Sequence, residues 1–423
     1  MPTRAINVED SVSRISERLI EVSHTIHQNP ELAFEEHQAM AVLAAEIQTH
    51  GFTVERGAYG LPTAFEAVRG TGDFRVVICA EYDALPQIGH ACGHNIIAAA
   101  GLGAAVALGE VAEDYGLTVV LLGTPAEEHG GGKALLLERG AWNGATISLM
   151  VHGAAGENDV SCSLVNTQAV DRFDVTYTGR AAHAAAAPHE GINAGDAATV
   201  ALVAIGLLRQ QLRDGIRLGA FVDHGGEATN IIPAITRLRA EVRAFDSVTL
   251  EDAKERMLAC FEGGAIATGC QWDVQRSEPR YEELAQNQVL AEIWDDQLRA
   301  LGRTVVSAHA LTGGSTDMGN VSQAVPSIHP MIMVRGATGV PHTEQFARDA
   351  ATPAADEAML HGALALAKTV LSAASEPSRS QLIKEAARQR DTNARQQEAG
   401  SSRQQINSQP EDFTGNHQAC PIK

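Results

Sequence analysis

The chain places a thiol and an imidazole two residues apart, at Cys92 and His94. Both lie in a glycine-containing segment, residues 89–95, that follows an apolar run and precedes an Ala/Gly-rich run. Such a loop can turn both side chains toward one point, and thiolate sulfur and neutral imidazole nitrogen are preferred ligands of zinc and similar ions. The pair therefore predicts a metal site. A buried cysteine beside a helix-capping histidine is the alternative that this motif alone leaves open.

Two adjacent carboxylates, Glu127 and Glu128, precede three glycines at residues 130–132. Holding two like charges close together is costly unless a cation or a proton gives them different roles. One carboxylate can bind a metal while the other stays free as a general base for water. An acidic surface loop is the alternative for this segment.

Two more histidines are candidate ligands. His152 ends a predicted strand, where a structural histidine is the alternative, and His342 lies among few apolar neighbours, where a surface histidine is the alternative. A metal held by these groups would lower the pKa of bound water and polarise the bond under attack. The candidate ligands for one or two divalent ions, Zn²⁺ or Mn²⁺, are then Cys92, His94, Glu128, His152 and His342.

These residues follow segments with clear periodicity. Apolar runs at residues 76–80, 117–122 and 147–151 are typical of strands covered on both faces. Helical patterns alternate with them at residues 11–50 (broken at Asn29-Pro30), 96–108 and 133–139. This alternation predicts an α/β domain with a mostly parallel sheet, in which ligands collect at the carboxyl ends of the strands.

Near residue 167 the pattern changes to strand, helix, two strands and helix, which indicates an inserted α+β, ferredoxin-like unit with an antiparallel sheet. Sheet edges of this kind often pair across a dimer. The predicted domains are a catalytic domain in two parts (1–167 and 283–375), an inserted lid or dimerisation domain (168–282) and a polar, poorly ordered C-terminal tail (376–423).

Composition narrows the classes of partner. The net charge of −20 argues against binding to nucleic acid or to anionic membranes, but it does not identify a substrate. The six cysteines are scattered and do not indicate a disulfide framework. No secretory leader or membrane-spanning run is visible, so a cytoplasmic location is expected.

Several motifs resemble the M20 family of metallo-aminopeptidases, carboxypeptidases and aminoacylases. The similarity covers residues 11–372 and is closest to the branch with a Cys-Gly-His loop, which includes p-aminobenzoyl-glutamate hydrolase and the M20-domain dipeptidases. The motifs are residues 27–32 (HQNPEL), 90–95 (HACGHN), 124–132 (TPAEEHGGG), 179–184 (GRAAHA), 229–233 (TNIIP) and 313–321 (GGSTDMGNV).

The resemblance implies roles for individual residues. Glu127 would be the general base, and the five candidate ligands would hold metal. His183, on the lid, would stabilise the oxyanion, in many relatives across a dimer interface. Asn230 and Arg243 would hold polar groups of the substrate, although a surface ion pair is an alternative for Arg243. Asp83 would orient a ligand imidazole. A homodimer or higher homo-oligomer through the lid is implied as well.

The expected activity is metal-dependent hydrolysis of a C–N bond in a small carboxylate-bearing substrate, such as an N-acyl amino acid or a dipeptide-like amide. The alternative is an aminohydrolase that releases ammonia from an aromatic amine such as 5-nitroanthranilate. Asn95, which stands where many family members have aspartate, leaves room for that alternative. A non-catalytic binding protein would be expected to lack Glu127 or the ligands, and both are present.

Overall fold

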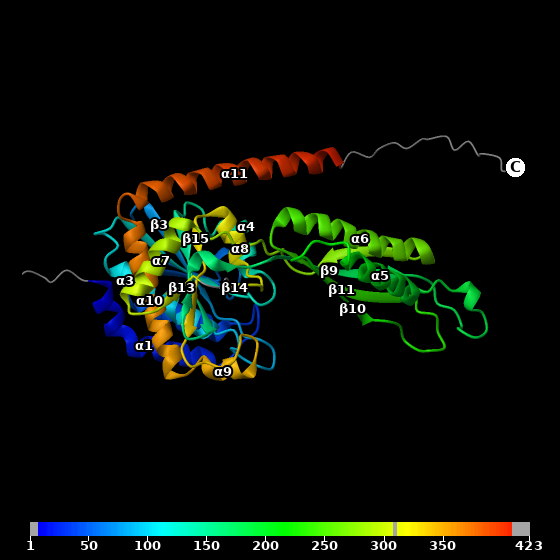
Figure 1. Ribbon diagram of the computed structural model, residues 1–423, viewed down its shortest axis with the longest axis horizontal. Coiled ribbons are helices and arrows are strands. Elements are labelled where there is room, and N and C mark those ends of the chain that lie inside the picture. Colours follow the sequence, from blue (N-terminus) through cyan, green and yellow to red (C-terminus); the bar gives the residue numbers. More distant parts are fainter. Residues whose placement is uncertain (1–6, 308–310, 408–423) are drawn as a thin grey trace, which may run out of the picture.

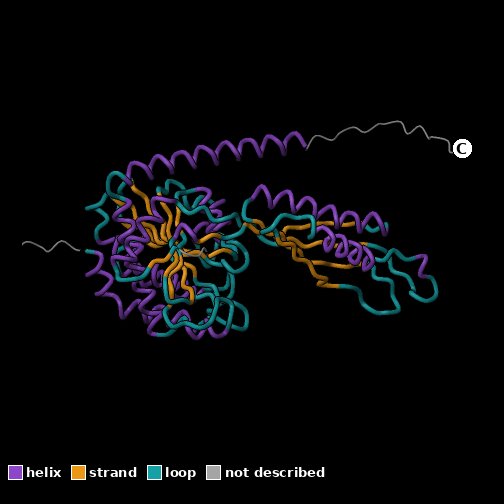
Figure 2. Tube along the Cα trace, viewed as in Figure 1, coloured by secondary structure: helices purple, strands orange, loops and turns teal. Residues whose placement is uncertain are grey.

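The computed structural model describes residues 7–307 and 311–407, and it has two lobes (Figure 1). The larger lobe contains both ends of the described chain. The smaller lobe, called the lid below, contains the elements between Ala169 and Arg276. The chain passes into the lid and back through two neighbouring segments, which form a narrow connection (Figure 2).

The main sheet of the larger lobe has six strands in the order β1-β2-β4-β3-β5-β15. These strands are β1 (Thr53–Arg56), β2 (Phe65–Arg69), β3 (Phe74–Glu81), β4 (Leu117–Thr124), β5 (Ile147–Leu149) and β15 (Ser327–Ile328). β3 pairs in parallel with β4 and β5, and β5 pairs in parallel with β15, whereas β1 and β2 run antiparallel to their neighbours. The carboxyl ends of the parallel strands β4, β3, β5 and β15 therefore lie side by side at the same end of the sheet.

Helices cover both faces of this sheet because successive side chains of a strand point to opposite sides. Val76 and Ile78 of β3 belong to the core that contains α1 (Val8–Gln28), α3 (His94–Glu110) and α10 (Pro353–Ala373). Val77 and Cys79 belong to the core on the other face, with α4 (Gly132–Glu138) and α8 (Met318–Ala324). The remaining helices of the larger lobe are α2 (His37–Thr49), α7 (Gln288–Ala300), α9 (Glu344–Asp349) and α11 (Ser378–Asn407).

Two adjacent strands of the sheet break at the same level. β5 is followed by β6 (His152–Ala155) and β15 by β16 (Met331–Val334), and β6 pairs in parallel with β16. The apolar segment at residues 327–334 is therefore interrupted at His329-Pro330, because the proline has no N–H for the ladder. Short parallel pairs complete the lobe: β7 (Asp159–Val160) with β13 (Val305–Val306), and β8 (Val165–Asn166) with β14 (Leu311–Thr312).

The lid is an antiparallel sheet with helices on one face. Its strand order is β10-β11-β9-β12, with α5 (Ala194–Arg209) and α6 (Ser247–Thr268) packed on the sheet. The strands are β9 (Ala169–Thr178), β10 (Arg217–His224), β11 (Ile235–Ala244) and β12 (Gln271–Arg276). Alternate residues of β11 are buried, so the face away from the helices is open. The α/β class with an inserted α+β lid is confirmed.

The C-terminal segment differs from its predicted disorder. α11 begins at Ser378, and Leu382 and Ala386 on it are buried against the larger lobe. Arg390 donates to the carbonyl of Ala145 at 3.0 Å. The segment is polar overall, but Leu382 and Ala386 form a narrow apolar stripe on one side of the helix. This stripe is enough to pack the helix against the larger lobe. The predicted tail of residues 408–423 lies outside the described residues.

Two further findings bear on the chain's surroundings. In the described part, no single helix is long and apolar enough to cross a membrane; only the bent pair of α10 with residues 378–393 passes by length and composition. Of the six cysteines, the five within the described residues are free, and Cys420 lies outside them.

Candidate metal centre and active site

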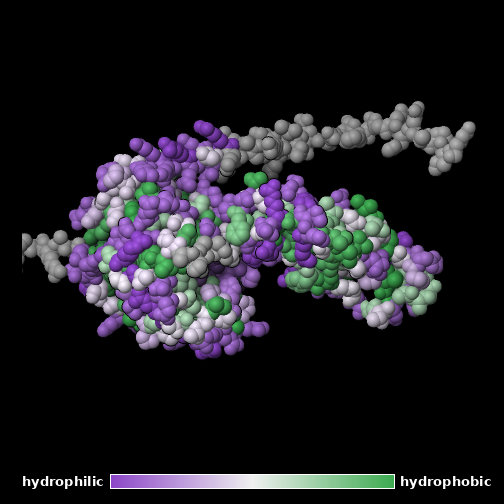
Figure 3. Space-filling model, in the orientation of Figure 1, coloured by the Kyte–Doolittle hydropathy of each residue, from purple (hydrophilic) through white to green (hydrophobic). Residues whose placement is uncertain are grey.

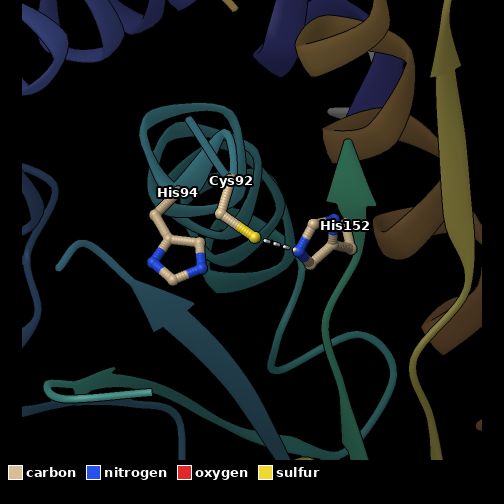
Figure 4. Close-up of side chains that lie close together, drawn as sticks. All are labelled: Cys92, His94 and His152. Atoms are coloured by element: carbon tan, nitrogen blue, oxygen red, sulfur yellow. Dashed lines mark hydrogen bonds between the residues drawn. The ribbon is translucent and has the colours of Figure 1, made fainter. Parts of the chain in front are cut away.

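Cys92 and His94 flank a glycine in a left-handed conformation. Gly93 has φ 76° and precedes the first residue of α3. A side chain there would be strained, and its Cβ would lie 3.2 Å from the ring of Phe346. The turn brings Cys92 Sγ to 3.3 Å from His152 Nε2, and Figure 4 shows Cys92 between the rings of His94 and His152.

Asp83 orients His94. His94 Nδ1 lies 2.8 Å from the carbonyl oxygen and 3.0 Å from Oδ1 of Asp83. Because Nδ1 is engaged, Nε2 faces the acidic residues at 3.6 Å from Glu81, 3.8 Å from Glu127 and 3.9 Å from Glu128. Asp83 also accepts a hydrogen bond from the N–H of Glu128 at 2.9 Å. One carboxylate thus positions two candidate ligands.

The turn that carries the adjacent carboxylates is held by several contacts. Ala126 has φ 60°, which is uncommon for alanine, and its N–H donates to Glu36 Oε1 at 2.8 Å. The Tyr281 hydroxyl donates to the carbonyl of Glu127 at 2.7 Å and accepts from the N–H of Gly131 at 3.0 Å. Burial, with the nearby carboxylates, raises the pKa of Glu127 well above its ordinary value. This side chain is therefore suited to holding a proton.

His152 and His342 approach Cys92 from two other segments. His152 Nδ1 lies 2.8 Å from the carbonyl of the next residue, which leaves Nε2 for the cluster. His342 has a left-handed φ of 67°, and its N–H donates to the carbonyl of Ala91 at 2.8 Å. Its Nε2 lies 3.5 Å from Cys92 Sγ and 3.4 Å from Glu128 Oε2. The strained backbone of His342 thus serves the placement of its ring.

The donor atoms fit a divalent metal. They form three overlapping groups in which the atoms lie within 4.8 Å of one another: Cys92–His94–His152, Cys92–Glu128–His342 and Glu81–His94–Glu127. Buried His94 Nε2 and Glu128 Oε1 have no hydrogen-bond partner among the described residues, which is costly without a cation. One sulfur with imidazoles and carboxylates suits zinc and is compatible with manganese.

A cavity of about 390 Å³ opens beside this cluster. Cys92, Glu127 and His152 line it from the larger lobe, and Arg243 lines it from the lid. Arg243 Nη1 donates to Ser315 Oγ at 3.2 Å, and its Nε donates to Glu241 at 2.9 Å. The cavity therefore combines the cluster with a guanidinium group.

His183 and Asn230 are not brought to this cavity within one chain. Both are exposed and lie in the loops after β9 and before β11, at the end of the lid far from the larger lobe (Figure 1). His183 Nδ1 accepts from the N–H groups of Ala185 and Ala186 at 3.2 and 3.1 Å. The contacts within one chain give these two residues no role at the cluster.

Sequence reasoning missed a fully buried ion-pair cluster behind the site. Lys133 Nζ pairs with Glu81 and, at 2.7 Å, with Asp317 Oδ1. Burial raises the pKa of Glu81, but Lys133 and His94 hold the pKa below its ordinary value. The sequence contains only two weak signals for this cluster. Glu81 ends an apolar run, and Lys133 follows three glycines. His329, which also lines the cavity, was missed as well.

Comparison with known proteins agrees with this geometry. Residues 77–372 match the model of peptidase family M20/M25/M40. The chain is 37% identical over 390 residues to the Xaa-Arg dipeptidase of Mus musculus, covering 87% of this chain and 88% of that protein. It is 30% identical over 282 residues to one of the p-aminobenzoyl-glutamate hydrolase polypeptides of Escherichia coli, covering 62% of this chain and 58% of that protein.

A solved structure shares the fold. A dinuclear metal-binding peptidase of family M20 from Bacillus subtilis superposes with a TM-score of 0.63 at 21% identity, covering 85% of this chain and 98% of that one. The family match spans most of the chain and includes every candidate ligand. The chain therefore belongs to peptidase family M20/M25/M40 and is a metal-dependent hydrolase of C–N bonds in small amide substrates.

Proposed function

We propose that the chain is a dipeptidase that prefers a basic second residue. The observation that carries this proposal is the cavity in which Glu127 and the ligand cluster lie opposite Arg243. A guanidinium in that place suits the terminal carboxylate of a dipeptide. The similarity to an Xaa-Arg dipeptidase over most of both chains supports a dipeptide substrate.

An adjoining cavity supports the preference for a basic residue. It has a volume of about 610 Å³, shares His129 and Arg172 with the first cavity, and is lined by the acidic residues Asp174, Glu241 and Glu278. Glu241 and Glu278 pair with Arg172, whereas Asp174 has no ion pair among the described residues. A long cationic side chain from the substrate would place its charge near these carboxylates.

The chemistry follows from the positions of the side chains. Cys92, His94, Glu128, His152 and His342 would hold one or two Zn²⁺ or Mn²⁺ ions, which supply water activation and polarisation of the scissile carbonyl. Glu127 takes a proton from the attacking water and later gives it to the leaving amine, so the products are an acid and an amine. Asp83 keeps the His94 ring in place, and Arg243 binds the substrate carboxylate.

The proposed site is completed by a second copy of the chain. His183 and Asn230 lie too far along the lid to serve their own cavity, so a partner's lid must supply the oxyanion donor and the second polar contact. Val203 and Leu207 on α5 have exposed apolar side chains that suit such pairing. Figure 3 shows apolar residues exposed over α5. The free cysteines of the described residues suit a cytoplasmic location.

The test is a substrate comparison with metal-free enzyme restored with Zn²⁺ or Mn²⁺. The substrates are Ala-Arg, Ala-Leu, Ala-Glu and an aromatic amine such as 5-nitroanthranilate. The proposal expects metal-dependent release of acid and amine, fastest with Ala-Arg. Release of ammonia from the aromatic amine would assign the aminohydrolase reaction instead, and no metal-dependent turnover would contradict a catalytic role.

A further inference from the structure

His329 is a buried imidazole that lines the active-site cavity without a polar partner. His329 is among the residues that line the cavity, although it is only 2% exposed. Neither Nδ1 nor Nε2 has a hydrogen-bond partner among the residues that the structure describes. Leaving such groups unpaired costs about 1–3 kcal/mol each. A buried polar ring that faces a substrate cavity is suited to pairing with the substrate.

The backbone of His329 is held in place by a single side chain. Gln286 Oε1 accepts from the N–H of His329 at 2.9 Å, and Gln286 Nε2 donates to the carbonyl of His329 at 3.1 Å. Pro330 follows directly and limits the backbone further. These two hydrogen bonds fix the backbone of His329, and this limits the directions that its ring can take. The ring centroid lies 5.6 Å from that of His152.

The neighbours of His329 indicate which part of a substrate reaches it. The scissile carbonyl must lie at the ligand cluster, which includes His152, so His329 is adjacent to the groups attached to that carbonyl. On the first residue of a dipeptide the nearest polar group is the free amino group. Arg243, on the lid side, suits the carboxylate at the other end.

We propose that His329 is a specificity-determining residue that accepts a hydrogen bond from the free amino group of the substrate's first residue. This inference rests on the proposed dipeptidase function and extends it to the amino-terminal side. A neutral imidazole has one ring nitrogen without a proton, and that nitrogen can accept a hydrogen bond. His329 thereby distinguishes dipeptides from N-acyl amino acids that lack this amino group.

The test compares Ala-Arg with N-propionyl-arginine, which differs from it only by lacking the amino group. In the wild type, kcat/KM for Ala-Arg is expected to exceed that for N-propionyl-arginine by about tenfold or more, because a hydrogen bond to a charged group is worth about 1.5–3 kcal/mol. In His329→Phe the ratio falls close to one through loss of Ala-Arg turnover. His329→Asn, which keeps an acceptor, restores part of the ratio. Met331→Leu, on the same cavity wall, is the matched control and keeps the wild-type ratio.

Metal content and thermal unfolding are measured for each variant to exclude loss of the site or the fold. A wild-type ratio near one, or an equal loss of both substrates in His329→Phe, overturns the assignment of His329 while leaving the dipeptidase function in place. Failure of the wild type to hydrolyse either substrate would instead contradict the dipeptidase function itself. The two failures are thus distinguishable.

Discussion

Glu127 and Glu128 are chemically identical, and their surroundings give them different roles. Glu128 Oε2 lies 3.4 Å from His342 Nε2, and Glu128, Cys92 and His342 form one group of side chains that could hold a metal ion. Glu127 is buried, and this burial together with nearby Glu81 raises the pKa of Glu127. We therefore propose metal binding for Glu128 and acid–base chemistry for Glu127.

Replacing each of these carboxylates should therefore have different results. Glu127→Gln is expected to lower kcat by about 10²–10⁴-fold, because it removes the group that moves the proton, with little change in bound metal. Glu128→Gln is expected to lose metal together with activity. Elemental analysis beside steady-state kinetics checks both. Loss of metal from Glu127→Gln would make that residue a ligand.

Glu36 gives a prediction about pH. Burial raises the pKa of Glu36 to about 7, and its Oε1 accepts from the N–H of Ala126, which precedes the carboxylate pair. Its folded-state pKa is above the unfolded value of about 4.3. The stabilising contribution of protonated Glu36 is thus complete below about pH 4 and is lost as the pH rises through about 7.

The free energy of unfolding should therefore fall by about 3–4 kcal/mol across this range from Glu36 alone. Glu36→Gln keeps an acceptor for Ala126 and cannot ionise, so it should flatten that slope. Urea unfolding at several pH values measures the difference between the two proteins. An equal slope in both would show that Glu36 does not titrate in this range.

The candidate ligands could be predicted from the sequence because each follows a recognisable apolar run or a glycine loop. His329 and Lys133 could not be predicted, because their roles depend on the break between β15 and β16 and on a contact with distant Asp317. Asn95 shows the same limit. Its amide donates to Ser23 and to the carbonyl of Ala350, both at 2.9 Å, so it supports the packing of α3 rather than the charge of the metal centre.

At the level of elements, the main class and order of strands and helices followed from periodicity alone. The helix at the end of the chain did not, because α11 is polar along most of its length and, among its residues whose burial is described, only Leu382 and Ala386 are buried. Leu382 is fully buried at this contact, and Asn287 donates to Glu385 on the same helix at 2.7 Å. α11 is thus part of the folded lobe in its first turns.

Leu382→Ala should lower the free energy of unfolding by about 2–5 kcal/mol, because it removes a fully buried side chain and leaves a cavity. Lys384→Ala, an exposed position on the same helix, is the matched control and should change it by less than about 0.5 kcal/mol. Chemical denaturation of both variants makes the comparison. Equal stability of the two would mean that α11 contributes nothing to the fold.

At the level of the whole molecule, the length of the lid separates two parts of the proposed site. β9 runs from Ala169, beside the larger lobe, to Thr178, and at about 3.3 Å per residue it spans about 30 Å. His183 lies beyond its far end, whereas Glu127 lies in the cavity. Within one chain His183 is thus separated from Glu127, and the dimer that we propose, in which each lid serves the partner, would bring these two residues to the same site.

Mixing two inactive variants tests this arrangement. His183→Ala and Glu127→Gln should each lose most activity as homodimers, because every site lacks one of the two groups. After unfolding and refolding together, a mixed dimer regains one site that has both its own Glu127 and the partner's His183. An equal mixture should recover about a quarter of wild-type activity, since about half of the dimers are mixed and each has one complete site. Recovery no greater than the sum of the separate variants would place His183 outside the partner's site, and mixing each variant with itself controls for the refolding step.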